Sequence, residues 1–309
     1  LSKYCLGTWS LGGEEKNNIS YGNINRTKAE NLLRYAYARG INFFDTANVY
    51  GSAEKRLGHV FKDIREKVFI ANKVGCTSFK KKLNFSKKLI DKQLETSIKN
   101  LNTKYLDLVQ LYDPDPNDNN LKQCIKHLHK KKKDGTIRFI GISLRQPADY
   151  IKLRKLYNFD AIQCNFNVLD QRVLDPKILK LLRKDKVKIF ARTILNFGIF
   201  TNEFVDKNIK FKKNDHRYKW DKKQVLLWKE HIKKLKYISS RPIENTCYRF
   251  CNSFNMSSLI FGANSKKHID IAIKNGNKKL KKKELSRINY VYKAFSKNIM
   301  LKPKIPIKQ

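Results

Sequence analysis

Three side chains that could move a proton stand close together in the first quarter of the sequence. Asp45 directly follows the apolar run Ile41 to Phe44, and Tyr50 comes five residues later beside a glycine. Lys73 ends a second apolar run. An ammonium beside a phenol favours the phenolate and lowers the phenol pKa from about 10. Lys73 could therefore make Tyr50 an acid that protonates a carbonyl oxygen, with Asp45 keeping the amine charged.

This chemistry still lacks a source of hydride. Reduction of a carbonyl needs a hydride as well as a proton, and no protein side chain supplies one. The residues therefore predict a nicotinamide cofactor and a small-molecule carbonyl substrate.

Polar or small residues stand at or just past the ends of most apolar runs. These positions are Asp45, Lys73, Tyr112, Ser143, Gln163, Arg192 and Gly262. A single polar residue at a strand end is usually a turn former. In a parallel barrel, however, the carboxyl ends of all strands meet at one mouth, where the chemistry is done. We therefore expect these residues to line one site.

Apolar runs alternate with amphipathic stretches along the whole chain, which is typical of strands alternating with helices. We predict strands at 4–8, 41–44, 68–72, 106–111, 137–142, 161–164, 187–191 and 258–261. Helices are expected near 27–38, 53–62, 86–101, 119–132, 147–156, 175–184, 222–238 and 266–275. The first helix opens with Thr27 and Glu30, the pattern of a capping box. Eight such units predict an α/β fold, a (β/α)8 TIM barrel.

The barrel is expected to fill a single domain, residues 1–309. Residues 196–221 form a long polar loop after the seventh strand. An extra C-terminal helix is predicted near 281–296, and residues 297–309 form a tail rich in Pro and Lys.

Segments spread through nearly the whole chain resemble the aldo-keto reductase family. The most specific is Asp45-Thr46-Ala47 followed by Tyr50-Gly51, which matches the family signature. The others are Gly7-Thr8-Trp9 with Gly12-Gly13, Ala71-Asn72-Lys73-Val74-Gly75, Asp107 to Leu111, Gly141-Ile142-Ser143, Gln163 to Asn167, Arg192 to Leu195 and Phe261-Gly262-Ala263. The resemblance implies a (β/α)8 barrel and NAD(P)H-dependent reduction of an aldehyde or ketone.

The resemblance also implies roles for individual residues. The catalytic residues would be Asp45, Tyr50 and Lys73, with Tyr112 beside them. Ser143 and Gln163 would bind the nicotinamide carboxamide, and Arg192 would pack on the nicotinamide ring. The other cofactor-binding residues would be Gly7, Thr8, Trp9, Asp45, Thr193 and Leu195, and, in the loop for the adenosine phosphate, Gly262, Asn264, Ser265, Lys266 and His268. A loop and helix start after the last strand is also a physically expected phosphate site.

The chain departs from the family pattern at three places. Tyr112 stands where the family usually has His, and it could donate a hydrogen bond or only pack at the strand end. Leu144 replaces the usual Asn. Asn264 and Ser265 replace arginines of the phosphate loop. The lysines that follow could still neutralise a 2′-phosphate, so NADPH is expected, with NADH as the alternative.

Two functions of different classes fit these residues. The first is a cytoplasmic NAD(P)H-dependent oxidoreductase that reduces a carbonyl, such as a keto-sugar, with a Tyr general acid. The alternative is a cofactor-binding regulatory or partner subunit with little turnover, like the potassium-channel beta subunits of the same family. Asn214-Asp215-His216-Arg217 resembles an element of a subgroup whose members look sugar-related. An ion pair that orders the loop explains this element equally well.

The composition argues against other functions. Lys+Arg 67 against Asp+Glu 27 gives a net charge of +40, which suggests nucleic acid or an anionic membrane. Lys, Asn and Ile are all abundant and share AT-rich codons, so genome composition accounts for much of this charge. We therefore expect no main function in nucleic-acid binding. The sequence contains no run of 18 apolar residues, so we expect no membrane helix. Of six cysteines only Cys247 and Cys251 lie close together, so we expect reduced thiols and no metal site.

Overall fold

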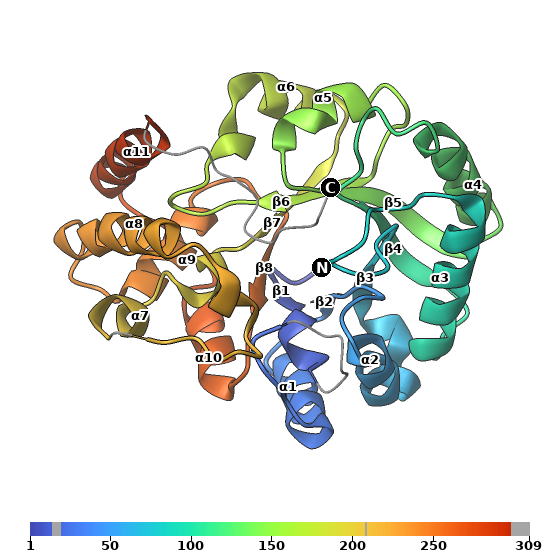
Figure 1. Ribbon diagram of the computed structural model, residues 1–309, viewed down its shortest axis with the longest axis horizontal. Helices are drawn as coiled ribbons and strands as arrows, with labels where there is room; N and C mark the ends of the chain where they lie inside the picture. Colours follow the sequence, from blue (N-terminus) through green and yellow to red (C-terminus); the bar gives the residue numbers. More distant parts are fainter. Residues whose placement is uncertain (14–19, 208, 298–309) are drawn as a thin grey trace.

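Eight parallel strands form one closed barrel in sequence order, with β1 paired to β8 (Figure 1). This computed structural model describes residues 1–13, 20–207 and 209–297. The strands are β1 (Tyr4–Gly7), β2 (Phe43–Asp45), β3 (Phe69–Val74), β4 (Leu106–Tyr112), β5 (Ile137–Leu144), β6 (Ala161–Asn165), β7 (Lys188–Arg192) and β8 (Ser258–Gly262). The predicted (β/α)8 barrel is confirmed, and each strand end lies within two residues of the sequence-based prediction.

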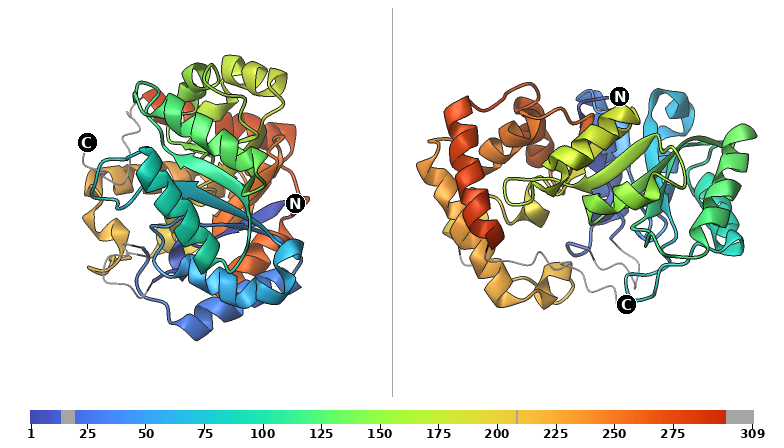
Figure 2. Two further views of the ribbon diagram at one scale, coloured as in Figure 1. Left: turned by 90° about the vertical axis from the view of Figure 1, so that its right-hand side faces the viewer. Right: turned by 90° about the horizontal axis from the view of Figure 1, so that it is seen from above.

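Helices surround the strands, and α7, α8 and α11 add to the side of β7 and β8 (Figures 1 and 2). The α-helices are α1 (Arg26–Ala38), α2 (Ala53–Phe61), α3 (Lys87–Asn100), α4 (Leu121–Lys133), α5 (Tyr150–Leu153), α6 (Pro176–Lys184), α7 (Asn202–Asp206), α8 (Lys222–Lys233), α9 (Ile243–Asn252), α10 (Lys266–Lys274) and α11 (Lys282–Lys297). The predicted extra helix α11 packs on α8, where the rings of Phe295 and His231 lie 5.1 Å apart. Among the described residues, every helix is too short or too polar to cross a membrane.

The two faces of the sheet are filled differently, because successive side chains of a strand point to opposite sides. The outer face packs against the helices in one large apolar core. The inner face forms an apolar plug near the amino ends of the strands, made of Cys5, Phe43, Ala71, Leu108, Ala161, Phe190 and Ile260. Polar side chains two residues further along the same face therefore lie at the carboxyl end, above this plug. They include Asp45, Lys73, Gln110 and Gln163.

The start of α1 differs from the prediction. The side chain of Asn25 accepts a hydrogen bond from the Lys28 N–H at 2.8 Å and caps the helix. The predicted capping box is wrong, since Glu30 binds the side chains of Arg26 and His59 instead. Thr27 and Asn25 are both residue types that cap helices, but the helix begins at Arg26, so Asn25 occupies the N-cap position.

The predicted loop 196–221 contains more structure than expected. It holds η5 (Asn196–Gly198), α7 and η6 (His216–Lys219), and it returns to the loop after β1 through a bridge between Ser20 and Asp215. Helix α9 was not predicted at all, although its buried face is continuous with the core. Of the predicted tail, Lys297 ends α11 and the residues beyond it lie outside the described part of the chain.

Candidate active site

An ion pair between Asp45 and Lys73 stands at the centre of the barrel mouth. The Lys73 ammonium lies 2.6 and 2.7 Å from the two carboxylate oxygens and also donates to the Thr46 carbonyl at 3.1 Å. Asp45 ends β2 and Lys73 lies near the end of β3, so the neighbouring strands bring the two together. Both side chains are buried. A buried charge needs such a partner, because desolvation penalises it heavily.

Two further predicted residues join this pair. The Gln163 amide donates to Asp45 Oδ1 at 2.6 Å, and the Ser143 hydroxyl donates to Gln163 Oε1 at 3.2 Å. Ser143 and Gln163 are register partners on β5 and β6, and both are buried. One polar chain therefore runs across the mouth from Lys73 to Ser143, as the positions at the strand ends predicted.

Tyr50 lies beside the ion pair on the loop after β2. The Lys73 ammonium is 5.1 Å from the centre of the Tyr50 ring, and the Tyr112 hydroxyl hydrogen-bonds to the Tyr50 oxygen. The Tyr50 backbone can lie against residue 12 only because that residue is a glycine, since a Cβ on Gly12 would lie 1.6 Å from the Tyr50 carbonyl oxygen. Gly12 therefore lets the loop after β1 pass directly over the backbone of Tyr50.

The pKa of Tyr50 is raised well above its usual value of 10. Burial is the largest cause, and the Asp45 carboxylate raises the pKa further, while Arg192 and the hydrogen bond from Tyr112 lower it. The expected net lowering of this pKa is therefore wrong for the protein alone, since burial and the Asp45 carboxylate outweigh the groups that lower it. The physical reason is first the burial of the phenol and then the Asp45 carboxylate, which lies 2.6 Å from the Lys73 ammonium.

A buried carboxylate on α2, behind the site, links β3 to α3. Glu54 on α2 accepts hydrogen bonds from Asn72 at 2.7 Å, from Ser97 at 2.8 Å and from Asn100 at 3.0 Å. Asn72 precedes Lys73, and Glu54 follows the loop that carries Tyr50. This network therefore fixes the phenol and the amine relative to each other. Glu54 was not among the predicted site residues, although it closely follows Tyr50-Gly51 in the sequence.

The wall of the mouth is aromatic. The Trp9 ring lies 6.2 Å from the Tyr50 ring, 5.7 Å from Phe79 and 4.6 Å from His216. Thr8 is buried beneath it, and its hydroxyl donates to the Asp45 carbonyl at 2.9 Å. Phe79 was missed, because an apolar residue in a loop gives no sequence signal for a site. Trp9 and Thr8 lie at the mouth as expected, and Gly7 is the register partner of Asp45.

A tight turn follows β7. Thr193, Asn196 and Phe197 all have positive φ values, of 63°, 44° and 59°, which non-glycine residues adopt rarely. Such strained backbone is common where a loop must aim groups at a ligand. Within the described part of the chain, the buried Arg192 Nε and Asn165 Oδ1 atoms lack hydrogen-bond partners. Arg192 and Asn165 are register partners, so these two polar atoms belong to the same side of the mouth. Leu195 closes the turn, and its carbonyl accepts from Gly198 and Phe200.

The predicted phosphate loop lies at the start of α10. Gly262, Asn264, Lys266 and His268 are exposed, and Ser265 is half-buried. Among the described groups, the Ser265 hydroxyl caps none of the free N–H groups of α10, which leaves them available to an anion. A hollow of about 470 Å³ lies between this helix start and that of α1, lined by Asn25, Thr27, Lys28, Asn31, Leu32, Ser265 and Lys266.

Comparison with known proteins identifies the family. The profile of the aldo/keto reductase family matches residues 3–293. The chain belongs to the aldo/keto reductase family. A probable aldo-keto reductase of Glycine max is 28% identical over 213 residues, which cover 64% of this chain and 61% of that protein. A D-arabinose 1-dehydrogenase of Saccharomyces cerevisiae is 29% identical over 197 residues, or 56% of each chain. The matched region thus spans about three fifths of the length of these relatives.

The fold of this aldo/keto reductase also matches solved structures. A glycerol dehydrogenase of Gluconobacter oxydans superposes with a TM-score of 0.79 at 21% sequence identity, covering 97% of this chain and 94% of that one. At this identity the likeness shows the shared fold alone.

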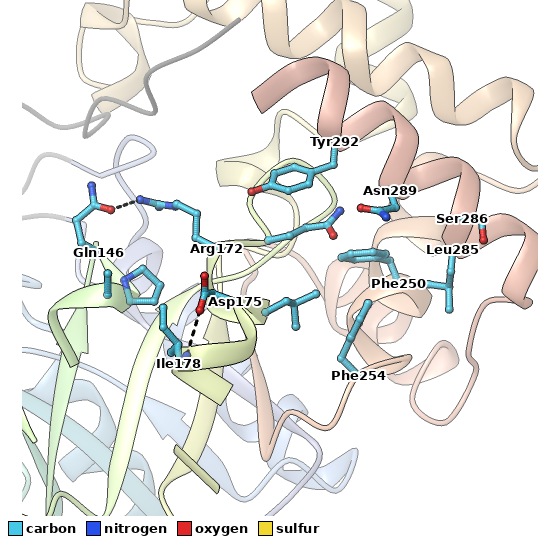
Figure 3. A pocket seen from close by; sticks show the side chains of 14 residues that line it. Gln146, Arg172, Asp175, Ile178, Phe250, Phe254, Leu285, Ser286, Asn289 and Tyr292 are labelled. Atoms are coloured by element: carbon cyan, nitrogen blue, oxygen red, sulfur yellow. Dashed lines mark hydrogen bonds between the residues drawn. The ribbon is translucent and has the colours of Figure 1, made fainter. Parts of the chain in front are cut away.

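A second hollow of this aldo/keto reductase lies away from the ion pair. It measures about 750 Å³ and opens between the loops after β5 and β6, α9 and α11 (Figure 3). Its charged groups are already paired, since Arg172 binds Asp170 at 2.7 Å and Gln146 at 2.5 Å, while Asp175 caps α6. The mouth, with its unpaired polar atoms, is therefore the better candidate for the active site.

Among the described residues, His, Cys, Asp and Glu side chains nowhere gather in a group of three that could hold a metal ion. All six cysteines are free and buried. Cys247 and Cys251, which attracted notice by their spacing, lie on the buried face of α9, and burial raises the pKa of both thiols.

Proposed function

We propose that this protein is an NAD(P)H-dependent oxidoreductase that reduces an aldehyde or ketone, with Tyr50 as the general acid. One observation carries the proposal: a buried Asp45–Lys73 pair lies directly beside a phenol that a second phenol, Tyr112, hydrogen-bonds. Proton donors of this kind are placed within hydrogen-bonding reach of the group that they protonate.

The mouth has the groups that would hold a nicotinamide cofactor. Ser143 and Gln163 offer a hydroxyl and an amide for a carboxamide, and Arg192 Nε and Asn165 Oδ1 are buried polar atoms that need partners. The uncapped start of α10, with Lys266 beside it, suits a phosphate. These residues fit the cofactor that the family implies. A reduced nicotinamide, when bound, supplies the hydride.

Tyr50 then completes the reduction by proton transfer. Its raised pKa keeps the phenol protonated at neutral pH, so it is in the form that can donate. The substrate oxygen becomes an alkoxide as the C–H bond forms, and an alkoxide is a stronger base than a phenolate. The O–H bond of Tyr50 breaks and its proton ends on the product alcohol. The hydrogen bond from Tyr112 stabilises the phenolate that remains, because a donor to the charged form lowers the pKa.

Asp45 and Lys73 act on this step through position and charge. Asp45 holds the ammonium 5.1 Å from the centre of the Tyr50 ring. The cation is then in place when negative charge develops on the phenol oxygen, and a fixed charge in a buried site is worth more than in water. Tyr112, which stands at the family's usual His position, thus has a role beyond packing.

The substrate that we favour is a polar, hydroxylated carbonyl compound, and the cofactor that we favour is NADPH. The relative named as D-arabinose 1-dehydrogenase supports the first choice. Lys266 and Lys267 at the start of α10 support the second, since they can pair with a 2′-phosphate.

Steady-state turnover tests the proposal. The purified protein is assayed with NADPH and with NADH against a panel of simple and hydroxylated aldehydes, and cofactor binding is followed by quenching of tryptophan fluorescence. We expect turnover with at least one aldehyde and tighter binding of NADPH. Binding of neither cofactor below about millimolar concentration would refute the assignment of the mouth. Binding without turnover of any carbonyl would instead support the partner-subunit function.

A further inference from the structure

His216 is a buried side chain whose polar atoms are unused. It begins η6 and is 6% exposed. Within the described part of the chain, neither ring nitrogen, Nδ1 nor Nε2, has a hydrogen-bond partner. Burying an unsatisfied polar group destabilises a fold, so a protein rarely keeps one without a use. The ring therefore needs an explanation that packing alone does not give.

Aromatic neighbours hold the His216 ring in one place. Its centre lies 4.6 Å from that of Trp9, 4.8 Å from Tyr21 and 5.1 Å from Trp220. The main-chain N–H of His216 donates to the Ser20 carbonyl at 2.7 Å, which fixes the backbone as well. The imidazole is thus held in place by residues of two loops, the loop after β1 and the loop after β7.

The residues on either side of His216 anchor this segment. Arg217 binds Asp215 with Nε at 2.9 Å and Nη2 at 2.7 Å, and it donates to the Phe197 carbonyl at 2.9 Å. The ion pair that orders the loop is therefore present. It accounts for Asp215 and Arg217, but it leaves the residue between them without a role.

The position of His216 connects it to the reaction centre. Trp9 contacts His216 on one side and Tyr50 on another, with ring centres 4.6 and 6.2 Å away. The indole N–H of Trp9 is also buried and without a partner among the described residues. Trp9 thus connects His216 to the phenol that we assign as the acid, and the part of the substrate beyond its carbonyl would extend along these two rings.

The charge state of the His216 ring indicates which kind of ligand group the ring can bind. Burial lowers the pKa of His216 to about 3, while Asp215 raises it and Arg217 lowers it further. A neutral imidazole has one N–H donor and one acceptor nitrogen. An alcohol hydroxyl has the same two functions, whereas a carboxylate or phosphate only accepts and would select a cation. The ring is therefore suited to an uncharged hydroxyl group.

We propose that His216 is a specificity-determining residue that hydrogen-bonds a hydroxyl of the substrate and so selects polyhydroxylated carbonyl compounds over unsubstituted ones. The inference rests on the proposed function, since it assigns the substrate class of the same site. A site built to hydrogen-bond a hydroxyl discriminates against the analogue that lacks it, because its buried polar groups are then left unpaired.

Substitution of His216 with matched substrates tests this role. Glyceraldehyde and propanal have the same carbon chain, with and without hydroxyl groups. His216→Leu should lower kcat/KM for glyceraldehyde by about 10-fold, the value of one hydrogen bond of roughly 1.4 kcal/mol, and leave kcat/KM for propanal nearly unchanged. His216→Gln keeps a donor and an acceptor and should recover most of the loss. His129→Leu, on the exposed side of α4, is the control for loss of a histidine elsewhere.

Two results would overturn the inference. Equal losses for both aldehydes would show that His216 only supports the fold, and equal kcat/KM values in all variants would show that it does not contact the substrate. A titration with xylitol, followed by tryptophan fluorescence, gives a readout without turnover, and His216→Leu should weaken this binding by a similar factor. Wild-type protein that reduces no carbonyl compound of the panel would refute the proposed function, and the xylitol titration would still decide the role of His216.

Discussion

Replacing Tyr50 by Phe removes a single oxygen from the centre of the site. The Tyr50 ring packs in a buried cluster with Ala47, Ala53, Cys76 and Phe79, and the substitution keeps all of these ring contacts. The variant should therefore fold and keep its affinity for the cofactor. Only the proton that the hydroxyl would give to the substrate oxygen is lost.

The expected loss of turnover follows from the size of general acid catalysis. A positioned acid contributes typically about 10²–10⁴-fold, so kcat of Tyr50→Phe should fall by a factor in that range. Tyr112→Phe removes only the hydrogen bond to the Tyr50 oxygen. A bond of about 0.5–1.5 kcal/mol corresponds to roughly a 2- to 13-fold loss. The two variants should thus differ by at least about tenfold.

The assay compares kcat, KM and the dissociation constant of NADPH for the two single variants and the double variant. Because Tyr112 acts on the Tyr50 oxygen, the double variant should be hardly slower than Tyr50→Phe alone. A reversed order refutes the reasoning: if Tyr112→Phe abolishes turnover while Tyr50→Phe is mild, the acid is on β4.

Three further perturbations follow from the same contacts. Lys73→Met should reduce kcat to about the level of Tyr50→Phe and raise the pKa of Tyr50 further, which single-turnover rates across pH would detect; a loss below about tenfold would contradict its role. Glu54→Ala removes the acceptor of hydrogen bonds from Asn72, Ser97 and Asn100 and should lower the free energy of unfolding by about 3 kcal/mol, measured by urea denaturation with Glu54→Gln as the milder control. The pKa of His216 falls from 6.5 unfolded to about 3 folded, so the unfolded chain binds the extra proton between these values and stability is lost as pH decreases from 6.5 towards 3. The wild type should lose more stability over this window than His216→Phe, and parallel pH curves for the two proteins would contradict the burial of a neutral ring.

The barrel could be predicted because its signals are local. Each apolar run is short, is bounded by turn residues and ends in a polar side chain, as at Asp45 and Gln163. Helix α9 escaped prediction, because its polar residues Glu244, Asn245 and Asn252 interrupt the apolar pattern. Packing, rather than periodicity, decides that this segment is a helix.

The chemistry of the site could be predicted less fully than its residues. The meeting of Asp45, Lys73 and Gln163 followed from their places at strand ends, because topology alone brings those ends together. The pKa of Tyr50 did not follow, since it depends on how deeply the ring is buried and on which charge Asp45 compensates. The contact between His216 and Trp9 joins segments far apart in the sequence, and no local pattern indicates it.

The attachment of the loop after β7 to the loop after β1 gives the protein two levels of stability. Each strand of the barrel is held by hydrogen bonds to both neighbours, but the His216 segment is held to Ser20 by one main-chain hydrogen bond and a bridge. In hydrogen exchange, the His216 amide should therefore exchange through local opening, long before the amides of β4 and β5. Opening of this attachment would thus leave every strand in the sheet.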